Sequence, residues 1–178
     1  VTTRCQVAEY VGRVQATTFS RMIDWLGRWY NNALANVERT GYGQAVIQDL
    51  CNLIYPSLWR EKKTTSSGYS FGPYGFATTD VGKPALNKAI IDSITDDDNG
   101  YTIRSVRLYK QLQIYDRLRN RKGIETKKTG AQEGRGNHDD LVIASGLAFH
   151  AAPDVIDMDP HGMLPMGGKL TEDLTPIE

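Results

Sequence analysis

The chain has 178 residues, which is enough for one domain with a sizeable core but too few for two large domains. Lysine plus arginine and aspartate plus glutamate both total 21, so the formal net charge is zero and excludes an overall basic field that would attract nucleic acid. The two cysteines, Cys5 and Cys51, form no close pair and argue against a disulfide framework or a structural zinc site.

No run of the sequence has the length and apolar character of a membrane span, and the N-terminal residues lack a secretory signal pattern. Together with the few cysteines, this predicts a cytoplasmic protein. Beyond Pro153 the chain is rich in proline and glycine and has no regular period. We therefore expect one main domain over residues 1–152 and a tail or linker over 153–178.

The N-terminal third predicts two helices, each preceded by a strand. Residues 3–14 are rich in β-branched residues and predict a strand, and the apolar spacing over 18–31 predicts an amphipathic helix that buries Trp25 and Trp29. Residues 34–38 predict a buried central strand that ends at Glu38. Apolar residues over 43–53 then recur at helical spacing, so Glu38 should lie near a junction between a strand and a helix.

The middle and C-terminal parts predict an exposed loop followed by three helices. Residues 66–75 are dominated by glycine, serine, proline and tyrosine, which predicts a flexible loop. Its aromatic residues Tyr69, Phe71 and Tyr74 could touch DNA as a flap, but we favour the simpler interpretation that they anchor the loop to the surface. Helical periodicity predicts helices over 84–94 and 106–118, joined by an acidic turn. His138-Asp139-Asp140 opens an apolar segment that predicts a buried helix with acidic residues at its N-terminus.

Basic residues gather between the last two predicted helices. This cluster is the best candidate in the sequence for contacts with phosphate groups. Its members are Arg117, Arg119, Arg121, Lys122, Lys127 and Lys128, with Arg135 nearby.

Three carboxylates could meet at the edge of the predicted sheet: Glu38 at a strand end, and Asp139 with Asp140 at a helix start. Carboxylate oxygens are the ligands that Mg²⁺ and Mn²⁺ prefer, and two such ions can promote phosphodiester hydrolysis. By spacing alone, however, acidic residues at these positions are more often helix caps or solvated surface groups. The spacing therefore leaves both interpretations open.

Four motifs in order give the chain a family resemblance over about residues 4–152. They are QVAEYVGRV, FSRMIDWLGRWYNNALANVERTGYG, GFATTDVGKPAL and GNHDDLVIASGLA. In this order they resemble the nuclease domain of phage large terminases. The resemblance implies a ribonuclease-H-like α/β fold, a mixed β-sheet flanked by helices, and cleavage of concatemeric double-stranded DNA with two Mg²⁺ or Mn²⁺ ions.

The resemblance also assigns roles to individual residues. Glu38 of NVERTG matches the second acidic metal ligand of the family, and Asp139 and Asp140 match the final acidic pair, of which Asp140 is the favoured direct ligand. The first aspartate of the family lies on a strand before QVAEYVGRV, and we expect that strand to be missing from this chain. His138 could orient a metal-bound water or contact the scissile phosphate, and Lys83 could hold DNA phosphate, although a hydrogen-bonded neighbour and a solvated lysine are the simpler interpretations.

The resemblance further implies partners and a location. The partners are double-stranded DNA, an ATPase domain in the same polypeptide, the portal protein and the small terminase subunit, in the host cytoplasm during capsid assembly. The sequence itself contains no GxxxxGK[ST] phosphate loop, so we predict no ATPase activity for this chain. Two alternatives stay open: a junction resolvase on the same fold, and a catalytically incomplete DNA-clamp or portal-docking module.

Overall fold

The protein is described from a computed structural model that covers residues 4–66, 68–97, 100–119, 125–131 and 138–156. These residues form a mixed α/β structure with five helices and two separate two-stranded antiparallel sheets. The α/β class predicted from the sequence is thereby confirmed. Within the described part of the chain, no helix is long and apolar enough to span a membrane.

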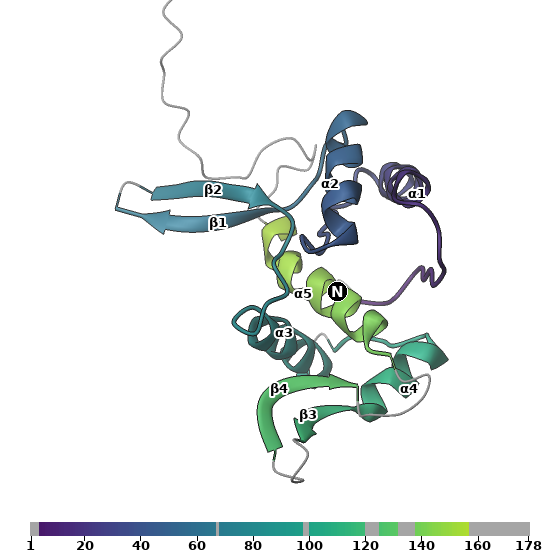
Figure 1. Cartoon of the computed structure of the whole chain (residues 1–178), viewed down its shortest axis with the longest axis vertical. Helices are drawn as coiled ribbons and strands as arrows, with labels where there is room; N and C mark the ends of the chain where they lie inside the picture. The colour runs from purple at the N-terminus through teal and green to yellow at the C-terminus, as the bar shows by residue number, and fades with distance from the viewer. Residues whose placement is uncertain (1–3, 67, 98–99, 120–124, 132–137, 157–178) are drawn as a thin grey trace, which may run out of the picture.

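Helix α5 (Asp140–Ile156) lies in the middle of the molecule, with α1 (Ala16–Trp29) and α2 (Tyr42–Asn52) on one side and α3 (Lys83–Thr95) and α4 (Val106–Ile114) on the other (Figure 1). Its segment of leucine, valine, isoleucine and alanine is apolar nearly all round, which is typical of a helix that packs on more than one side. The predicted helix from Asp139-Asp140 is therefore confirmed, and it continues through Pro153, past the domain boundary expected at residue 152.

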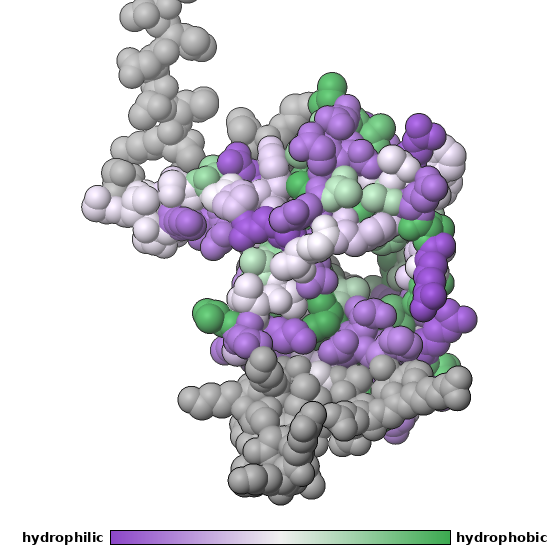
Figure 2. Space-filling view, viewed as in Figure 1, coloured by the Kyte–Doolittle hydropathy of each residue, from purple (hydrophilic) through white to green (hydrophobic). Residues whose placement is uncertain are grey.

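The core consists of clusters on both sides of this helix. On the α1–α2 side, Val46, Leu50 and Tyr55 are buried together. On the α3–α4 side, α5 contributes Leu141 and Val142 to one cluster with Ile90 and Leu108, and Ile143 and Leu147 to another with Leu86. The face in Figure 2 is hollowed between the two sides.

The α1–α2 side depends on a close approach at Gly27. A Cβ atom added there would lie 1.9 Å from the Tyr55 hydroxyl oxygen, so only glycine leaves room for that ring. The Tyr55 hydroxyl donates a hydrogen bond to the backbone oxygen of Ala33. The helix predicted over 18–31 is confirmed, but the expectation that Trp25 and Trp29 are buried is wrong, because their exposed fractions are 76% and 84%. The side of α1 that packs on α2 carries Phe19 and Ile23 instead.

The predicted N-terminal strand and the predicted central strand are reduced to isolated bridges. Cys5 forms one parallel bridge with Thr102, and residues 6–15 belong to neither helix nor strand. Residues 34–38 are half-buried on average, and within them Ala35 pairs with Leu58 and Glu38 pairs with Phe76, both in parallel. In the described residues these contacts do not extend into the mixed sheet that the resemblance implies.

The segment predicted as a loop over 66–75 is instead part of a β-hairpin formed by β1 (Arg60–Thr65) and β2 (Gly68–Tyr74). The tyrosine and phenylalanine side chains of β2 favour a strand, and this preference outweighs the turn-forming composition of the segment. Gly68, with a φ of 130°, provides the backbone conformation that the tight turn requires. The hairpin projects away from the helices (Figure 1).

The helix predicted over 106–118 ends at Ile114, and the chain continues as β3 (Tyr115–Arg119), which pairs with β4 (Glu125–Ala131). The Tyr115 hydroxyl donates to Asn87 Oδ1 of α3 at 2.8 Å, and this contact lies at the point where the helix becomes a strand. Long-range pairing therefore outweighs the helical periodicity of the sequence. The helix predicted over 84–94 is confirmed as α3, with proline in its first turn.

Candidate functional site

The carboxylates singled out in the sequence lie around one cleft of about 590 Å³. Glu38, Asp139, Asp140 and Lys83 all line it, although they are separated by up to 102 positions in the chain. The rest of its polar lining comes from neighbouring residues, namely Asn36, Thr40, Tyr42 and Thr78. The structure thus brings together the acidic residues and the lysine that the sequence analysis proposed separately.

Glu38 is positioned by the short segment that precedes α2. Its bridge to Phe76 fixes the backbone, and the Thr40 hydroxyl donates a hydrogen bond to Glu38 Oε1 at 2.9 Å. The start of α2 packs directly on this backbone, since a Cβ atom added at Gly43 would lie 1.7 Å from the Glu38 carbonyl oxygen. The half-buried carboxylate is therefore held at the cleft by both neighbouring segments.

Asp139 and Asp140 are held at the cleft by the N-terminal turn of α5. The Asp139 carbonyl oxygen accepts a hydrogen bond from the Ile143 backbone N–H at 2.9 Å, which begins the helix. The Leu141 backbone N–H donates to Gln111 Oε1 of α4 at 2.8 Å, so a neighbouring helix satisfies one of the free donors of this terminus. Asp139 is half-buried and Asp140 is exposed.

Three helices begin at this cleft. Tyr42 is the first residue of α2, Lys83 the first of α3 and Asp140 the first of α5, and all three line the cleft. Helix N-termini carry a partial positive charge and free backbone N–H groups, and both favour a bound anion such as phosphate. Half-buried Lys83 adds a full positive charge. The cleft therefore combines carboxylates with groups that attract anions.

Two buried oxygen atoms of cleft-lining residues have no hydrogen-bond partner among the described residues. They are Asn36 Oδ1 and Thr78 Oγ1. The Asn36 amide nitrogen donates to the Leu147 backbone oxygen at 2.9 Å, which ties the segment before Glu38 to α5. Sequence analysis missed both residues. Asn36 could have been found from its position two residues before Glu38, because alternate residues of an extended segment share a face.

The donor set fits a hard divalent cation in its chemistry, since carboxylate, amide and hydroxyl oxygens are its preferred ligands. In the ranges that the structure describes, however, no three side chains of histidine, cysteine, aspartate or glutamate lie close enough together to hold an ion. The site residues therefore share a cleft without forming a compact three-acid cluster.

The remaining predicted residues lie elsewhere. His138 is exposed and does not belong to the cleft lining. Arg119 lies on β3 and Lys127 and Lys128 lie on β4, but their side chains are outside the described part of the structure. Arg121, Lys122 and Arg135 fall outside the described residues altogether. The predicted phosphate contact of this basic cluster stays a prediction.

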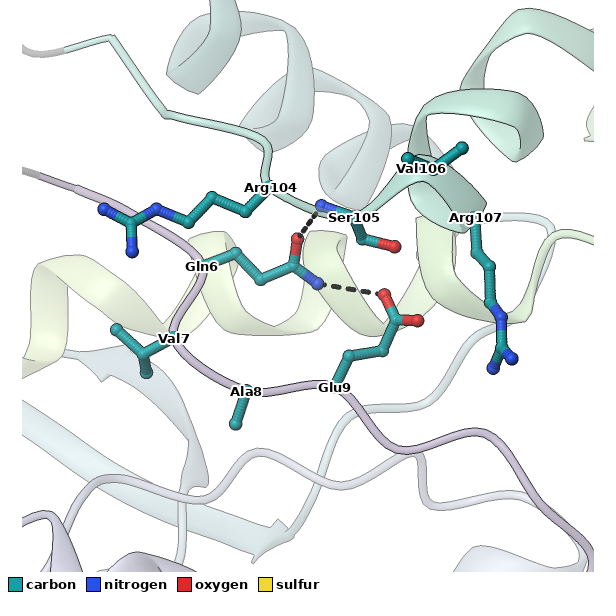
Figure 3. A pocket seen from close by; sticks show the side chains of 8 residues that line it. All are labelled: Gln6, Val7, Ala8, Glu9, Arg104, Ser105, Val106 and Arg107. Atoms are coloured by element: carbon teal, nitrogen blue, oxygen red, sulfur yellow. Dashed lines mark hydrogen bonds between the residues drawn. The ribbon is translucent and has the colours of Figure 1, made fainter.

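A separate hollow of about 430 Å³ lies where the N-terminal segment meets the start of α4 (Figure 3). There the Gln6 side chain accepts from the Ser105 backbone N–H at 3.0 Å and donates to Glu9 Oε2 at 3.1 Å. Arg104 and Arg107 extend to opposite sides of it, as Figure 3 shows. The hydrogen bond between Gln6 and Ser105 holds the N-terminal segment against the start of α4. None of the predicted site residues lines this hollow.

A third cleft, of about 520 Å³, is lined by residues at the root of the β1–β2 hairpin and by α5. Asp154 of α5 accepts a hydrogen bond from Trp59 Nε1 and forms an ion pair with Lys62, both at 2.6 Å. The His150 ring packs against Phe76 and Trp59, with centroids 4.7 and 5.6 Å away. Burial lowers the pKa of His150 below its usual value, and the nearby Asp154 carboxylate partly opposes this effect.

Comparison with known proteins identifies no relative of this chain. No model of a known protein family matches the chain, and neither curated protein sequences nor solved structures match it.

Proposed function

We propose that this chain is a divalent-metal-dependent DNA endonuclease domain of the phage large terminase type, with a ribonuclease-H-like arrangement around its cleft. The observation that carries the proposal is the convergence of Glu38, Asp139, Asp140 and Lys83 on one cleft. The motif order quoted above supports the same family independently of the structure. The implied partners are double-stranded DNA, the ATPase domain in cis, the portal protein and the small terminase subunit.

In this proposal Glu38, Asp139 and Asp140 hold Mg²⁺ or Mn²⁺ through their carboxylate oxygens. Bound there, two such ions would activate water and stabilise the leaving oxygen of a phosphodiester. Lys83 and the N-termini of α2, α3 and α5 would hold the phosphate group, because their positive charges face the same cleft. Thr40 would orient the Glu38 carboxylate through its hydrogen bond to Oε1.

Two measurements test the proposal: plasmid cleavage with Mn²⁺ or with excess chelator, and calorimetric titration of Mn²⁺ into the protein. Wild type should bind Mn²⁺ and cut the plasmid only without chelator. Glu38→Ala and Asp140→Ala should abolish cleavage and weaken Mn²⁺ binding by more than the roughly 10- to 100-fold cost of losing a residue that merely orients a ligand. The matched control, Asp97→Ala, removes an exposed carboxylate outside the cleft and should behave as wild type. A wild-type protein that neither binds Mn²⁺ nor cuts DNA would overturn the proposal.

A non-catalytic DNA clamp or portal-docking module is the second candidate. It is favoured by one observation, that the described residues contain no compact cluster of three metal-binding side chains. On this alternative the cleft binds DNA phosphate through Lys83 and the helix N-termini without cutting it. Plasmid binding that is unchanged by chelator, weakened by Lys83→Ala and never followed by cleavage would establish it.

A further inference from the structure

The β1–β2 hairpin presents exposed aromatic side chains on a projecting arm. Tyr69, Phe71 and Tyr74 lie on β2 with exposed fractions of 73%, 49% and 38%. The sequence predicts that these rings anchor a loop to the surface, but they lie on a strand and remain largely exposed to solvent. Figure 2 shows the hairpin standing out from the body, with predominantly hydrophilic to neutral colouring.

The strand register places aromatic and basic side chains together. Lys62 lies opposite Phe71 and Thr64 lies opposite Tyr69, and residues directly opposite in an antiparallel pair share a face. Tyr69 and Phe71 are two positions apart and so lie on this same face. The Arg60 guanidinium lies 5.5 Å from the centre of the Phe71 ring and 4.8 Å from that of Tyr74. Aromatic rings and cations therefore interleave along the arm.

The charge of the arm is positive although the whole chain is neutral. Its two strands carry Arg60, Lys62 and Lys63 against a single carboxylate, Glu61, which forms an ion pair with Arg39 at 3.6 Å. Lys62 is bound to Asp154, whereas Lys63 is exposed. Lys63 pairs with Ser70 and so lies on the face opposite to Tyr69 and Phe71, where its charge adds to the positive field of the arm.

We infer that the hairpin binds single-stranded DNA, with unpaired bases stacked on Tyr69 and Phe71 and phosphates near Arg60 on the same face, while Lys63 on the other face adds positive charge that attracts the strand. Stacking on aromatic rings needs bases whose flat faces are accessible, and duplex DNA keeps those faces covered by neighbouring base pairs. Rings alternating with cations suit a polynucleotide, since the bases and the phosphates of one strand are satisfied together. The inference goes beyond the proposed nuclease function, because it requires neither the cleft carboxylates nor a metal ion.

Fluorescence anisotropy with labelled 20-nucleotide oligothymidylate and a 20-base-pair duplex tests this inference, with chelator present to prevent cleavage. Wild type should bind the single strand more tightly than the duplex. Tyr69→Ala combined with Phe71→Ala should weaken single-strand binding by about tenfold or more for each ring lost. Lys63→Ala should reduce the slope of log K against log salt concentration by no more than about 0.7, because Lys63 attracts the strand from the other face of the hairpin. Oligodeoxyuridylate and oligouridylate of the same length differ only in the sugar and so identify the preferred sugar, and loss of binding in the ring variant is expected on either strand type.

The matched control is Tyr109→Ala combined with Lys110→Ala on α4, which removes one exposed ring and one exposed lysine far from the hairpin in sequence. It should bind oligothymidylate as wild type does, and circular dichroism should show the same helical content in all variants. Duplex preference in wild type, or equal weakening in the control, would overturn the inference. Single-strand binding without plasmid cleavage would contradict the nuclease proposal alone, and cleavage without a preference for the single strand would contradict this inference alone, so the two failures are distinguishable.

Discussion

Helices α1 and α5 are both predicted from apolar periodicity, but they occupy different environments. α5 lies in the middle of the molecule and buries Leu141, Val142, Ile143 and Leu147 in clusters with its neighbours. α1 lies at the edge and packs mainly on α2, leaving Trp25 and Trp29 in solvent. Periodicity therefore locates a helix, whereas the number of sides on which the helix packs decides which of its apolar residues are buried.

The largest expected effect comes from a substitution that disrupts the packing of α5. Leu147→Ala should lower the free energy of unfolding by about 2–5 kcal/mol, because it removes buried methyl groups and leaves a cavity beside Leu86 and Ile143. Urea denaturation followed by circular dichroism measures it. Val155→Ala on the same helix is the control, since this side chain is 50% exposed and its loss should cost little. Equal effects of the two substitutions would contradict the central position of α5.

A smaller effect concerns the face of α5 that packs on Trp59 and Phe76. Burial lowers the pKa of His150 in the folded state below the value near 6.5 of the unfolded chain. Between these two pKa values the unfolded state binds more protons than the folded state does. The contribution of neutral His150 to the free energy of unfolding is therefore fully present above pH 6.5 and is lost as the pH falls towards the folded-state pKa. His150→Phe should reduce the loss of stability between pH 7.5 and pH 5.5. Urea midpoints at the two pH values measure it, and an unchanged difference would show that other groups cause the dependence.

The smallest effect is expected on the exposed side of α1. Trp29→Ala should change the free energy of unfolding by no more than about 0.5 kcal/mol, because the side chain is 84% exposed. The same urea experiment measures it, with Ile23→Ala as the matched substitution on the packed side of α1. A loss of more than about 1.5 kcal/mol for Trp29→Ala, well outside the range of surface substitutions, would mean that this tryptophan is covered in solution.

The helices could be predicted from the sequence because their apolar residues recur at the helical period. Three other features could not be predicted in this way. The hairpin of residues 60–74 was hidden by its glycine, serine and proline content, and the end of α4 at Ile114 depends on pairing between Tyr115 and Ala131. Residues 6–15 have strand-like composition, but the described chain offers them no neighbouring strand. In each case the presence or absence of a pairing segment decides the conformation, and composition alone does not reveal it.

The candidate site was predictable where residue type and position at the end of an element together suggested a role. Glu38, Asp139, Asp140 and Lys83 were singled out by their positions at element ends, and they line the same cleft. Their proposed roles as metal ligands and phosphate contact stay predictions. Asn36 and Thr78 were not predicted, because an amide and a hydroxyl gain significance only when burial leaves them without a partner.

The close packing of Gly43 on Glu38 has a consequence for evolution. Any side chain at position 43 would displace the Glu38 backbone, so a lineage that retains this cleft should retain a glycine there. The glycine should then persist in descendants, although it has no side chain that could take part in chemistry. Loss of the carboxylate in some lineage would not release the constraint on the glycine, because the constraint comes from the backbone that the two segments share.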